Sequence, residues 1–181
     1  THTAQQALSG NLCRCTGYRP IVQAACQMQA QTGHAILEGP IVSALHDLKA
    51  TEQAHPHYSR PTSLPDLLKA RARQPQAQLI AGATDAGLWL TQGLRSMPNI
   101  IDLTRVEALQ KIEHYPKHIA IGAAVNLQDA FDALAQDRPV IGPFGERFAG
   151  WPVRQSGTLG GNVANGSPIG DSMPLLLALG A

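Results

Sequence analysis

The chain has 181 residues, of which 44% are apolar and 15% are charged, and its 14 basic and 13 acidic side chains leave a formal net charge of +1. This composition is typical of a packed globular protein and excludes a disordered chain. Near-neutral charge and an aromatic content of 4% disfavour a nucleic-acid partner. No apolar run reaches the roughly 20 residues that cross a bilayer. Three cysteines and no signal-peptide pattern predict a reducing, cytoplasmic location without a membrane partner.

The first 57 residues divide into two parts. Residues 1–32 predict two helices on either side of a cysteine-containing loop; the first ends near Gly10 and the second begins near Pro20. Residues 33–57 are rich in Gly and Pro and contain one short amphipathic stretch. We interpret them as a linker that packs on another surface.

From about residue 58 the pattern alternates between helix and strand. Helices are expected in TSLPDLLKARARQP, with Ser63 as N-cap, and in LQDAFDALAQ, with Asn126 as N-cap. Between them we expect strands in QLIAG and NIIDL, a helix in ATDAGLWLTQG and a hairpin around Pro116. The final stretch, MPLLLALGA, predicts apolar surface that needs a partner.

Cysteine chemistry is concentrated in GNLCRCTGYRP, residues 10–20. Cys13 and Cys15 lie one residue apart in a glycine-containing loop, where thiolates can hold a metal and backbone N–H groups can point at sulfur. On the residues alone, a metal or cluster site and a reduced structural pair are equally supported. Two thiolates are half of what a tetrahedral metal site or a [2Fe–2S] cluster needs. Cys26, within the second expected helix, is interpreted as a small buried apolar residue.

Two glycine-containing stretches are candidates for binding an anion. In LIAGATD, residues 79–85, a strand runs into Gly82 and a helix start, which suits a diphosphate, although an ordinary tight turn fits equally well. RQSGTLGGNVANGSPIGD, residues 154–171, is too rich in small polar residues to form a core, so we predict a ligand-binding loop. His55 and His57 lack partner ligands at useful spacing and are interpreted as solvated loop side chains.

Together these motifs resemble a known family. GNLCRCTGYRPI is similar to the second cluster-binding motif of the xanthine dehydrogenase family of molybdenum hydroxylases. In that family two such cysteines hold a [2Fe–2S] cluster together with an upstream C-x-x-C. LIAGATD and TLGGNVANGSPIGD, the latter preceded by RFAG, resemble the two FAD-binding stretches of the family's flavin domain. The order along the chain is also similar to that of the family's small subunits.

The resemblance implies an α+β fold in three parts. The C-terminal part of a helical [2Fe–2S]-binding domain would occupy residues 1–32, a linker residues 33–57, and an incomplete two-subdomain FAD-binding domain of the PCMH type residues 58–181. Compared with the family, the chain looks truncated at both ends. The upstream C-x-x-C would then lie outside this sequence, and the cluster could not close with protein ligands from one copy.

The resemblance also assigns roles to residues. Cys13 and Cys15 would be cluster ligands, and no residue of this chain would be catalytic. The diphosphate of FAD would lie along the backbone of the first stretch, Phe148 would pack against the adenine side of the nucleotide, and the second stretch would contact the diphosphate, ribityl chain or ring edge. The implied FAD-binding residues are Leu79, Ile80, Ala81, Gly82, Ala83, Thr84, Asp85, Phe148, Thr158, Gly161, Asn162, Ser167 and Asp171.

The functional expectation is an electron-transfer subunit. Electrons from hypoxanthine or xanthine, oxidised at a molybdenum centre on a large partner subunit, would pass through [2Fe–2S] clusters to FAD and on to NAD. A second hypothesis is a cofactor-free fragment, or a docking module for a molybdenum subunit, without activity of its own. A third is a zinc site on Cys13 and Cys15 that two chains share.

Overall fold

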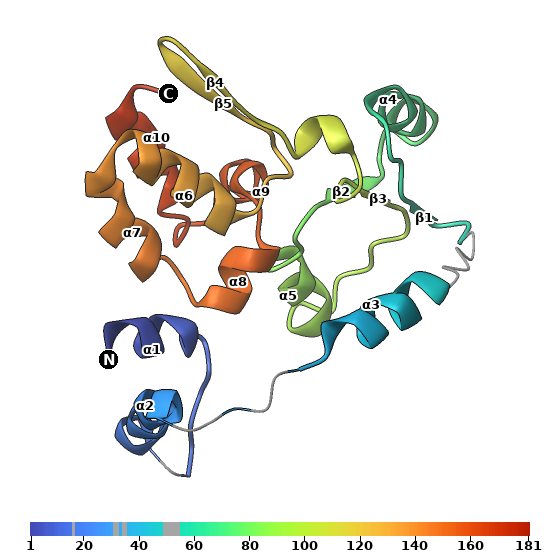
Figure 1. The fold of residues 1–181 in the computed structure, drawn as a ribbon. Helices are drawn as coiled ribbons and strands as arrows, with labels where there is room; N and C mark the ends of the chain where they lie inside the picture. Colours follow the sequence, from blue (N-terminus) through green and yellow to red (C-terminus); the bar gives the residue numbers. More distant parts are fainter. Residues whose placement is uncertain (16, 31–32, 34–35, 49–54) are drawn as a thin grey trace.

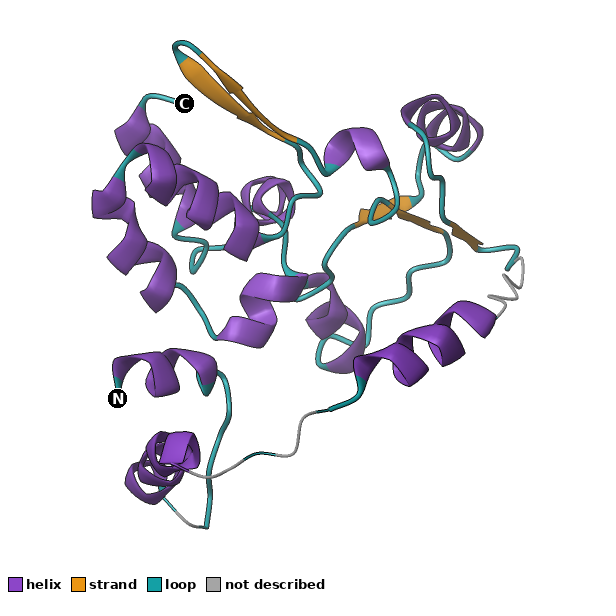
Figure 2. Cartoon of the chain, viewed as in Figure 1, coloured by secondary structure: helices purple, strands orange, loops and turns teal. Residues whose placement is uncertain are grey.

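The computed structural model describes residues 1–15, 17–30, 33, 36–48 and 55–181. Helices and strands both occur, which confirms the expected mixed α+β class (Figure 2). The helices are α1 (His2–Ala7), α2 (Tyr18–Gln27), α3 (Glu38–Asp47), α4 (Leu64–Arg73), α5 (Ala86–Thr91), α6 (Leu127–Asp137), α7 (Gly142–Arg147), α8 (Trp151–Ser156), α9 (Leu159–Asn165) and α10 (Ser172–Leu179). The strands are β1 (Tyr58–Ser59), β2 (Gln78–Ile80), β3 (Ile100–Asp102), β4 (Ile112–Tyr115) and β5 (His118–Ile121).

The elements form three groups (Figure 1). Helices α1 and α2 lie together at the N-terminal end, α3 leads away from them to the small β1–β3 sheet, and helices α6 to α10 cluster beside a projecting β4–β5 hairpin. Helix α5 and the loop before it lie between the sheet and the helical cluster. None of the helices in the described residues is long and apolar enough to cross a membrane.

The sheet positions the first glycine-containing stretch. Its three strands are parallel in the order β1–β3–β2, with Ile101 paired to Ser59 on one side and to Leu79 on the other. Ile101 is fully buried and belongs to a small core under α4. The chain leaves the carboxyl end of β2 through Ala81 and Gly82, at the edge of a parallel sheet where ligands commonly bind.

A second core anchors the other glycine-containing stretch. Its buried residues come from α6 and from the segments beside it, and are Val125, Leu127, Ala130, Phe131 and Leu159. Two backbone hydrogen bonds join the start of α6 to the start of α9: Leu127 N–H to the Gly157 carbonyl at 2.8 Å, and Leu159 N–H to the Val125 carbonyl at 3.0 Å. Residues 157–159 are therefore fixed by the core that holds α6.

Local sequence signals were correct at several helix and strand ends. The Ser63 hydroxyl accepts a hydrogen bond from Asp66 N–H at 3.2 Å, and the Asn126 side chain accepts one from Asp129 N–H at 2.8 Å. Both are therefore the N-caps that the sequence predicted. The expected hairpin is formed by β4 and β5, which pair antiparallel with Tyr115 opposite His118.

The loop conformation predicted for residues 154–171 is wrong, whereas ligand binding by this stretch stays a prediction. The stretch contains the end of α8 and the whole of α9. Thr158 caps α9 by accepting a hydrogen bond from Gly161 N–H at 3.1 Å, and Leu159 is buried in the core. The Thr158 cap and the buried Leu159 side chain thus both favour a helix in this glycine-rich segment.

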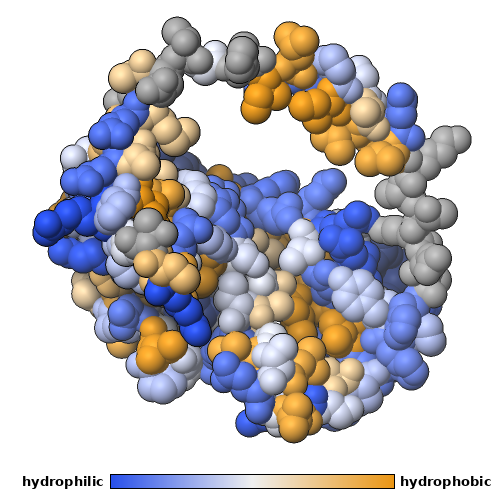
Figure 3. Space-filling view, turned by 90° about the horizontal axis from the view of Figure 1, so that it is seen from below, coloured by the Kyte–Doolittle hydropathy of each residue, from blue (hydrophilic) through white to orange (hydrophobic). Residues whose placement is uncertain are grey.

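The structure shows no packing surface for the described part of the predicted linker. Every residue from 36 to 48 is exposed, including apolar side chains of α3 such as Ile41 and Leu45. Figure 3 shows these apolar side chains gathered on a helix that stands apart from the main body. Residues 16, 31–32, 34–35 and 49–54, which also fall in the predicted N-terminal segment and linker, lie outside the described residues.

Candidate functional site

A cavity of about 600 Å³ lies where β2, α5 and α9 meet. Its volume is within the range of about 300–1,000 Å³ typical of cofactor pockets. The predicted residues that line it are Leu79, Ile80, Ala81, Gly82, Ala83, Thr84, Asp85, Thr158, Gly161 and Asn162. The structure therefore brings together both glycine-containing stretches, which are far apart in the sequence.

Side chains tie the two stretches to each other. The Ser156 hydroxyl donates a hydrogen bond to the Gly82 carbonyl at 2.9 Å, and the Asn165 amide donates one to the Asp85 carboxylate. These bonds cross from the end of α8 and from α9 to the loop after β2. The wall of the cavity is thus held in shape by its own residues before any ligand binds.

Glycine at position 82 permits this close approach. A Cβ added to Gly82 would lie 1.8 Å from the Ser156 carbonyl oxygen and 2.7 Å from Gly157 Cα. Next to it, Ala83 has a φ of 56°, a left-handed conformation that is costly for a non-glycine residue and is concentrated at ligand-binding turns. The loop after β2 therefore packs backbone against backbone on the end of α8, and this close approach shapes one wall of the cavity.

Asn162 is oriented by a buried neighbour. Ser172, which is fully buried, donates its hydroxyl hydrogen bond to Asn162 Oδ1. The amide nitrogen of Asn162 is then the group left for a ligand, and no described residue accepts a hydrogen bond from it. Because Asn162 lines the cavity, this amide supplies an N–H donor of the kind that binds phosphate oxygens.

Three predicted FAD-binding residues do not line the cavity. Phe148 packs in the second core, with ring centroids 5.0 Å from Phe131 and 6.0 Å from Phe144. Ser167 accepts a hydrogen bond from Ile169 N–H at 3.4 Å, and Asp171 is the exposed residue that precedes α10. Contact of these three residues with FAD stays a prediction from the family resemblance.

Sequence reasoning missed other lining residues, among them Arg71, Trp89, Leu127 and Asn165. Trp89 was detectable, because it lies one helical turn after the start of α5 and helical side chains lean back toward the N-terminus. Arg71 donates a hydrogen bond to the Ala77 carbonyl at 2.7 Å and so reaches the cavity from α4. No local pattern in the sequence indicates that contact.

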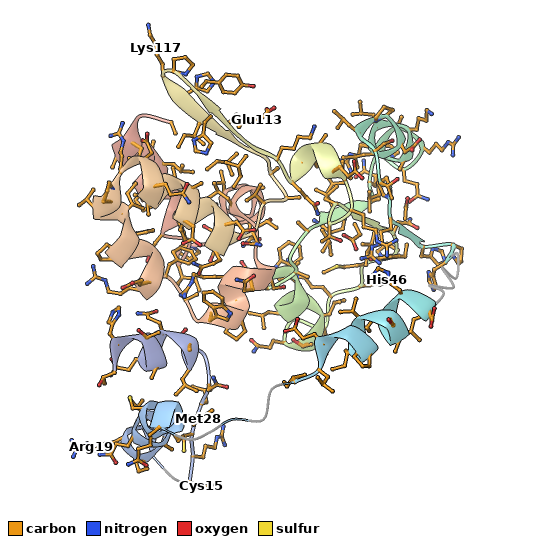
Figure 4. The ribbon with its side chains drawn as sticks, in the orientation of Figure 1. Cys15, Arg19, Met28, His46, Glu113 and Lys117 are labelled. Atoms are coloured by element: carbon orange, nitrogen blue, oxygen red, sulfur yellow. The ribbon has the colours of Figure 1, made fainter. Side chains whose placement is uncertain are left out.

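The two predicted metal ligands lie in the loop between α1 and α2. Cys15 is exposed at the tip of this loop (Figure 4), and Cys13 is half-buried. Gly17 N–H donates a hydrogen bond to Cys13 Sγ at 3.1 Å, the backbone-to-sulfur contact that tunes iron–sulfur clusters. The described residues hold no cluster of three or more His, Cys, Asp or Glu side chains suited to a metal. The loop thus offers two cysteine sulfur atoms as candidate ligands.

Cys26, His55 and His57, the other titratable residues considered in the sequence analysis, lie away from the cavity. Cys26 is half-buried on α2 and forms no disulfide. His55 and His57 are exposed, as expected; His55 Nδ1 accepts a hydrogen bond from His57 N–H at 3.2 Å, and His57 Nδ1 lies 3.1 Å from Asn99 Oδ1. These contacts order the entry to β1.

A buried carboxylate stabilises the sheet. Asp102, at the end of β3, accepts hydrogen bonds from the Tyr58 hydroxyl and from Thr104 N–H, the latter at 2.8 Å, and lies 3.5 Å from Arg60 Nε. Burial alone raises the pKa of Asp102, but these hydrogen bonds and the Arg60 charge together hold its pKa below the usual aspartate value. The hydrogen bond between the Tyr58 hydroxyl and the Asp102 carboxylate also raises the pKa of Tyr58.

The cavity between the two glycine-containing stretches and the loop that carries Cys13 and Cys15 are the two candidate cofactor-binding features of the described residues. Residues 50–181 match the family described as "FAD binding domain in molybdopterin dehydrogenase", and residues 1–26 match the "[2Fe-2S] binding domain". The chain therefore belongs to the family of molybdopterin-dehydrogenase FAD-binding domains and carries a [2Fe–2S]-binding domain ahead of it. This confirms the resemblance to molybdenum hydroxylases.

The relatives found by sequence include xanthine dehydrogenases. That of Drosophila pseudoobscura pseudoobscura is 30% identical over 232 aligned positions, covering 97% of this chain and 17% of the relative. The xanthine dehydrogenase/oxidase of Felis catus is 27% identical, covering 98% of this chain and 17% of the relative. The chain thus spans less than a fifth of the length of these relatives.

Solved structures show the same fold. The Cu,Mo-CO dehydrogenase has a TM-score of 0.58 and 30% sequence identity, covering 66% of this chain and 42% of that chain. Quinoline 2-oxidoreductase from Pseudomonas putida 86 has a TM-score of 0.54 and 28% sequence identity, covering 59% of this chain and 38% of that chain.

Proposed function

We propose that this chain is an electron-transfer part of a xanthine-dehydrogenase-type molybdenum hydroxylase. Electrons from a purine oxidised on a partner molybdenum subunit would reach FAD bound in the cavity through [2Fe–2S] clusters, and leave to NAD. FAD supplies the redox chemistry when bound. The cavity beside β2 carries this proposal, because both glycine-containing stretches form its walls.

The residues of the cavity fit FAD in three respects. The loop after β2 lines the cavity and packs so closely on the end of α8 at Gly82 that even a methyl group would meet the Ser156 carbonyl. Asn162 presents an amide donor whose orientation is fixed by Ser172. The 600 Å³ volume leaves room for a nucleotide, and Trp89 and Leu127 supply an apolar part of the lining. The chain's own role is to bind and orient the nucleotide and to restrict water.

We propose Cys13 and Cys15 as ligands of a [2Fe–2S] cluster. Their thiolates supply two of the four ligands, and the Gly17 N–H group stabilises negative charge on Cys13 sulfur. The remaining two ligands would come from polypeptide outside this chain. The shared zinc site is the competing explanation, and metal analysis distinguishes iron with sulfide from zinc.

The deciding experiment is a titration of the purified chain with FAD and, separately, with riboflavin, followed by flavin fluorescence. We expect FAD to bind more tightly than riboflavin, because the proposed cradle would contact the diphosphate, which riboflavin lacks. Asn162→Asp keeps the side-chain size but places a carboxylate at the cradle, so FAD affinity should fall by about tenfold or more while riboflavin binding is unchanged. Asn11→Asp, on the exposed loop after α1, is the matched control.

The outcomes separate the hypotheses. If neither flavin binds the wild-type chain, the FAD proposal fails and the cofactor-free fragment is the better description. If FAD and riboflavin bind equally and Asn162→Asp changes neither, the assignment of the diphosphate to this cradle is wrong. Reduction of NAD by xanthine in the assembled enzyme tests the substrate and acceptor; a failure there removes the purine assignment without affecting flavin binding.

A further inference from the structure

One end of the cavity beside β2 carries a positive charge. Among the described residues that line the cavity, Arg71 is the one basic side chain and Asp85 the one acidic side chain. The Asp85 carboxylate already accepts a hydrogen bond from the Asn165 amide. In the described part of the chain, Arg71 forms no ion pair with an acidic side chain. The charge of Arg71 is therefore available to a ligand in the cavity.

The guanidinium group of Arg71 is anchored to the sheet. Arg71 lies in the last turn of α4, and its Nη1 donates a hydrogen bond to the Ala77 carbonyl at 2.7 Å. Ala77 is 5% exposed and belongs to the same core as Leu67 of α4, so the acceptor is fixed. This bond uses one of the five N–H donors of a guanidinium. The remaining donors are held in place for a ligand.

Arg71 and the proposed position of the diphosphate lie at opposite ends of β2. Ala77, which anchors the guanidinium, comes just before the strand, and Gly82 comes after it. A strand advances about 3.3 Å per residue, so the chain from Ala77 to Gly82 spans up to about 16 Å. Both positions line the same cavity. A nucleotide with its diphosphate at Gly82 therefore has one of its two end groups on the Arg71 side.

The two ends of the cavity differ in their exposure to water. Arg71, Pro75 and Gln76 are exposed, whereas Leu127 and Thr158 on the other side are buried. The isoalloxazine ring is the redox-active part of FAD, and excluding water from a reacting group prevents side reactions. The adenosine half takes no part in that chemistry and tolerates an open site. The exposed end therefore suits adenosine, and the buried end suits the flavin ring.

We infer that Arg71 is a specificity-determining residue of the proposed flavin site and binds the adenosine half of FAD. The inference rests on the proposed function, because it takes the nucleotide as the ligand. A guanidinium plane stacks on the face of a purine, and its N–H groups match the acceptor nitrogens of adenine. This orientation turns the flavin end toward α6, so it departs from the expectation that Phe148 packs on the adenine side.

Arg71→Met is the direct test, because methionine keeps a flexible apolar stem and removes the guanidinium. Arg73→Met is the matched control. Arg73 is exposed in the same last turn of α4, and it does not line the cavity. Arg71→Lys is a second variant that keeps the positive charge but has no planar group to stack on a base.

The measurement is calorimetric titration of the whole chain with FAD, FMN and AMP. Arg71→Met should weaken the binding of FAD and of AMP by about tenfold, the size expected for losing a charged hydrogen-bond donor. FMN, which lacks adenosine, should bind as it does to the wild type and so reports that the cavity is intact. Arg71→Lys should lose about as much affinity for FAD as Arg71→Met, and Arg73→Met should lose none.

Three results would overturn the inference. Equal FAD affinity in the wild type and in Arg71→Met would remove the contact. An equal loss for FAD and FMN would assign Arg71 to the flavin half of the nucleotide or to general support of the cavity. Full FAD affinity in Arg71→Lys would show that charge alone acts, as it does on a phosphate.

The AMP titration keeps this test separate from the proposed function. If FAD binds the wild type and Arg71→Met equally, the proposed function stands and the role of Arg71 falls. If the wild type binds neither FAD nor FMN, the proposed function fails. The adenosine contact then depends on AMP alone: it stands if AMP binds the wild type about tenfold more tightly than Arg71→Met, and it falls if AMP binds both equally or neither.

Discussion

The iron–sulfur segment (residues 1–30) and the flavin region (residues 55–181) of this chain are stabilised in different ways. The flavin region has two clusters of buried apolar residues, one under the parallel sheet and one around α6. In the iron–sulfur segment, none of the residues whose exposure is described is buried. A segment without a core depends on bound metal and on contacts with its neighbours. Changes in the flavin region should therefore act on the stability of the fold. Changes in the iron–sulfur segment should act on metal binding and on docking to its neighbours.

The largest effect should come from the cysteine loop. Replacing Cys13 and Cys15 together by serine removes both thiolates, so iron incorporated by anaerobic reconstitution should disappear entirely. FAD affinity should stay at the wild-type value, because the loop lies outside the cavity. Iron and sulfide analysis beside a flavin titration checks this, with Cys26→Ser as the control that keeps its iron. Iron retention in the double variant would show that other residues bind it.

Gly82→Ala should be the most damaging single change in the flavin region. The new methyl group would meet the Ser156 carbonyl oxygen at 1.8 Å, so the loop and the end of α8 must separate. We expect FAD binding to be lost and the free energy of unfolding to fall by about 3 kcal/mol. Urea denaturation and flavin titration measure both. Gly87→Ala, in open surroundings on α5, should leave binding intact; equal behaviour of the two variants would contradict the close approach.

Ser172→Ala should have an intermediate effect. It removes the hydroxyl that orients Asn162, leaving the amide oxygen without its donor and the side chain able to rotate. FAD affinity should fall by about tenfold, while affinity for riboflavin, which has no phosphate, should not change. Fluorescence titration with both flavins measures the difference, and Ser43→Ala on exposed α3 is the control. An equal loss for both flavins would indicate general damage to the cavity.

The effect expected at Asp102 depends on pH. Its folded-state pKa is lowered, so its contribution to stability is complete above the unfolded-state pKa of about 3.9 and is lost as the pH falls through the folded-state pKa. Asp102→Asn should therefore reduce the free energy of unfolding by about 1–2 kcal/mol at neutral pH. The difference in free energy of unfolding between this variant and the wild type should shrink below pH about 4.

Urea denaturation at neutral and acidic pH tests this dependence. Asp47→Asn, an exposed position on α3, serves as the comparison for a carboxylate outside the sheet. If Asp102→Asn lowers the free energy of unfolding by the same amount at both pH values, the hydrogen bonds rather than the charge provide the stabilisation.

The features that the sequence predicted correctly, helix caps and a hairpin, depend on residues close to one another in the chain. Ser63 and Asn126 cap their helices because an acceptor side chain lies three residues before a backbone donor, a spacing visible in the sequence. The hairpin followed from a turn between two apolar stretches. The family motifs located about half of the cavity wall, including Gly82 and Asn162.

What the sequence could not supply depends on distant contacts. Helix α9 forms in a glycine-rich stretch because Leu159 is buried against the core of α6, a contact with no local signal. Phe148 lies among core aromatic rings for the same reason. The approach of Gly10 to Gly150 joins segments 140 residues apart, and each glycine alone looks like an ordinary turn residue.

The bonds across the cavity wall also bear on the order in which the protein folds. Ser156 and Gly82 are 74 residues apart in the chain, and Asn165 and Asp85 are 80 apart. Closing such long loops loses chain entropy before the contacts contribute favourable free energy. The wall should therefore assemble after the local helices and the hairpin. A ligand that binds only the closed wall shifts that late equilibrium toward the folded state by mass action. The supply of flavin during synthesis should thus raise the yield of folded chain.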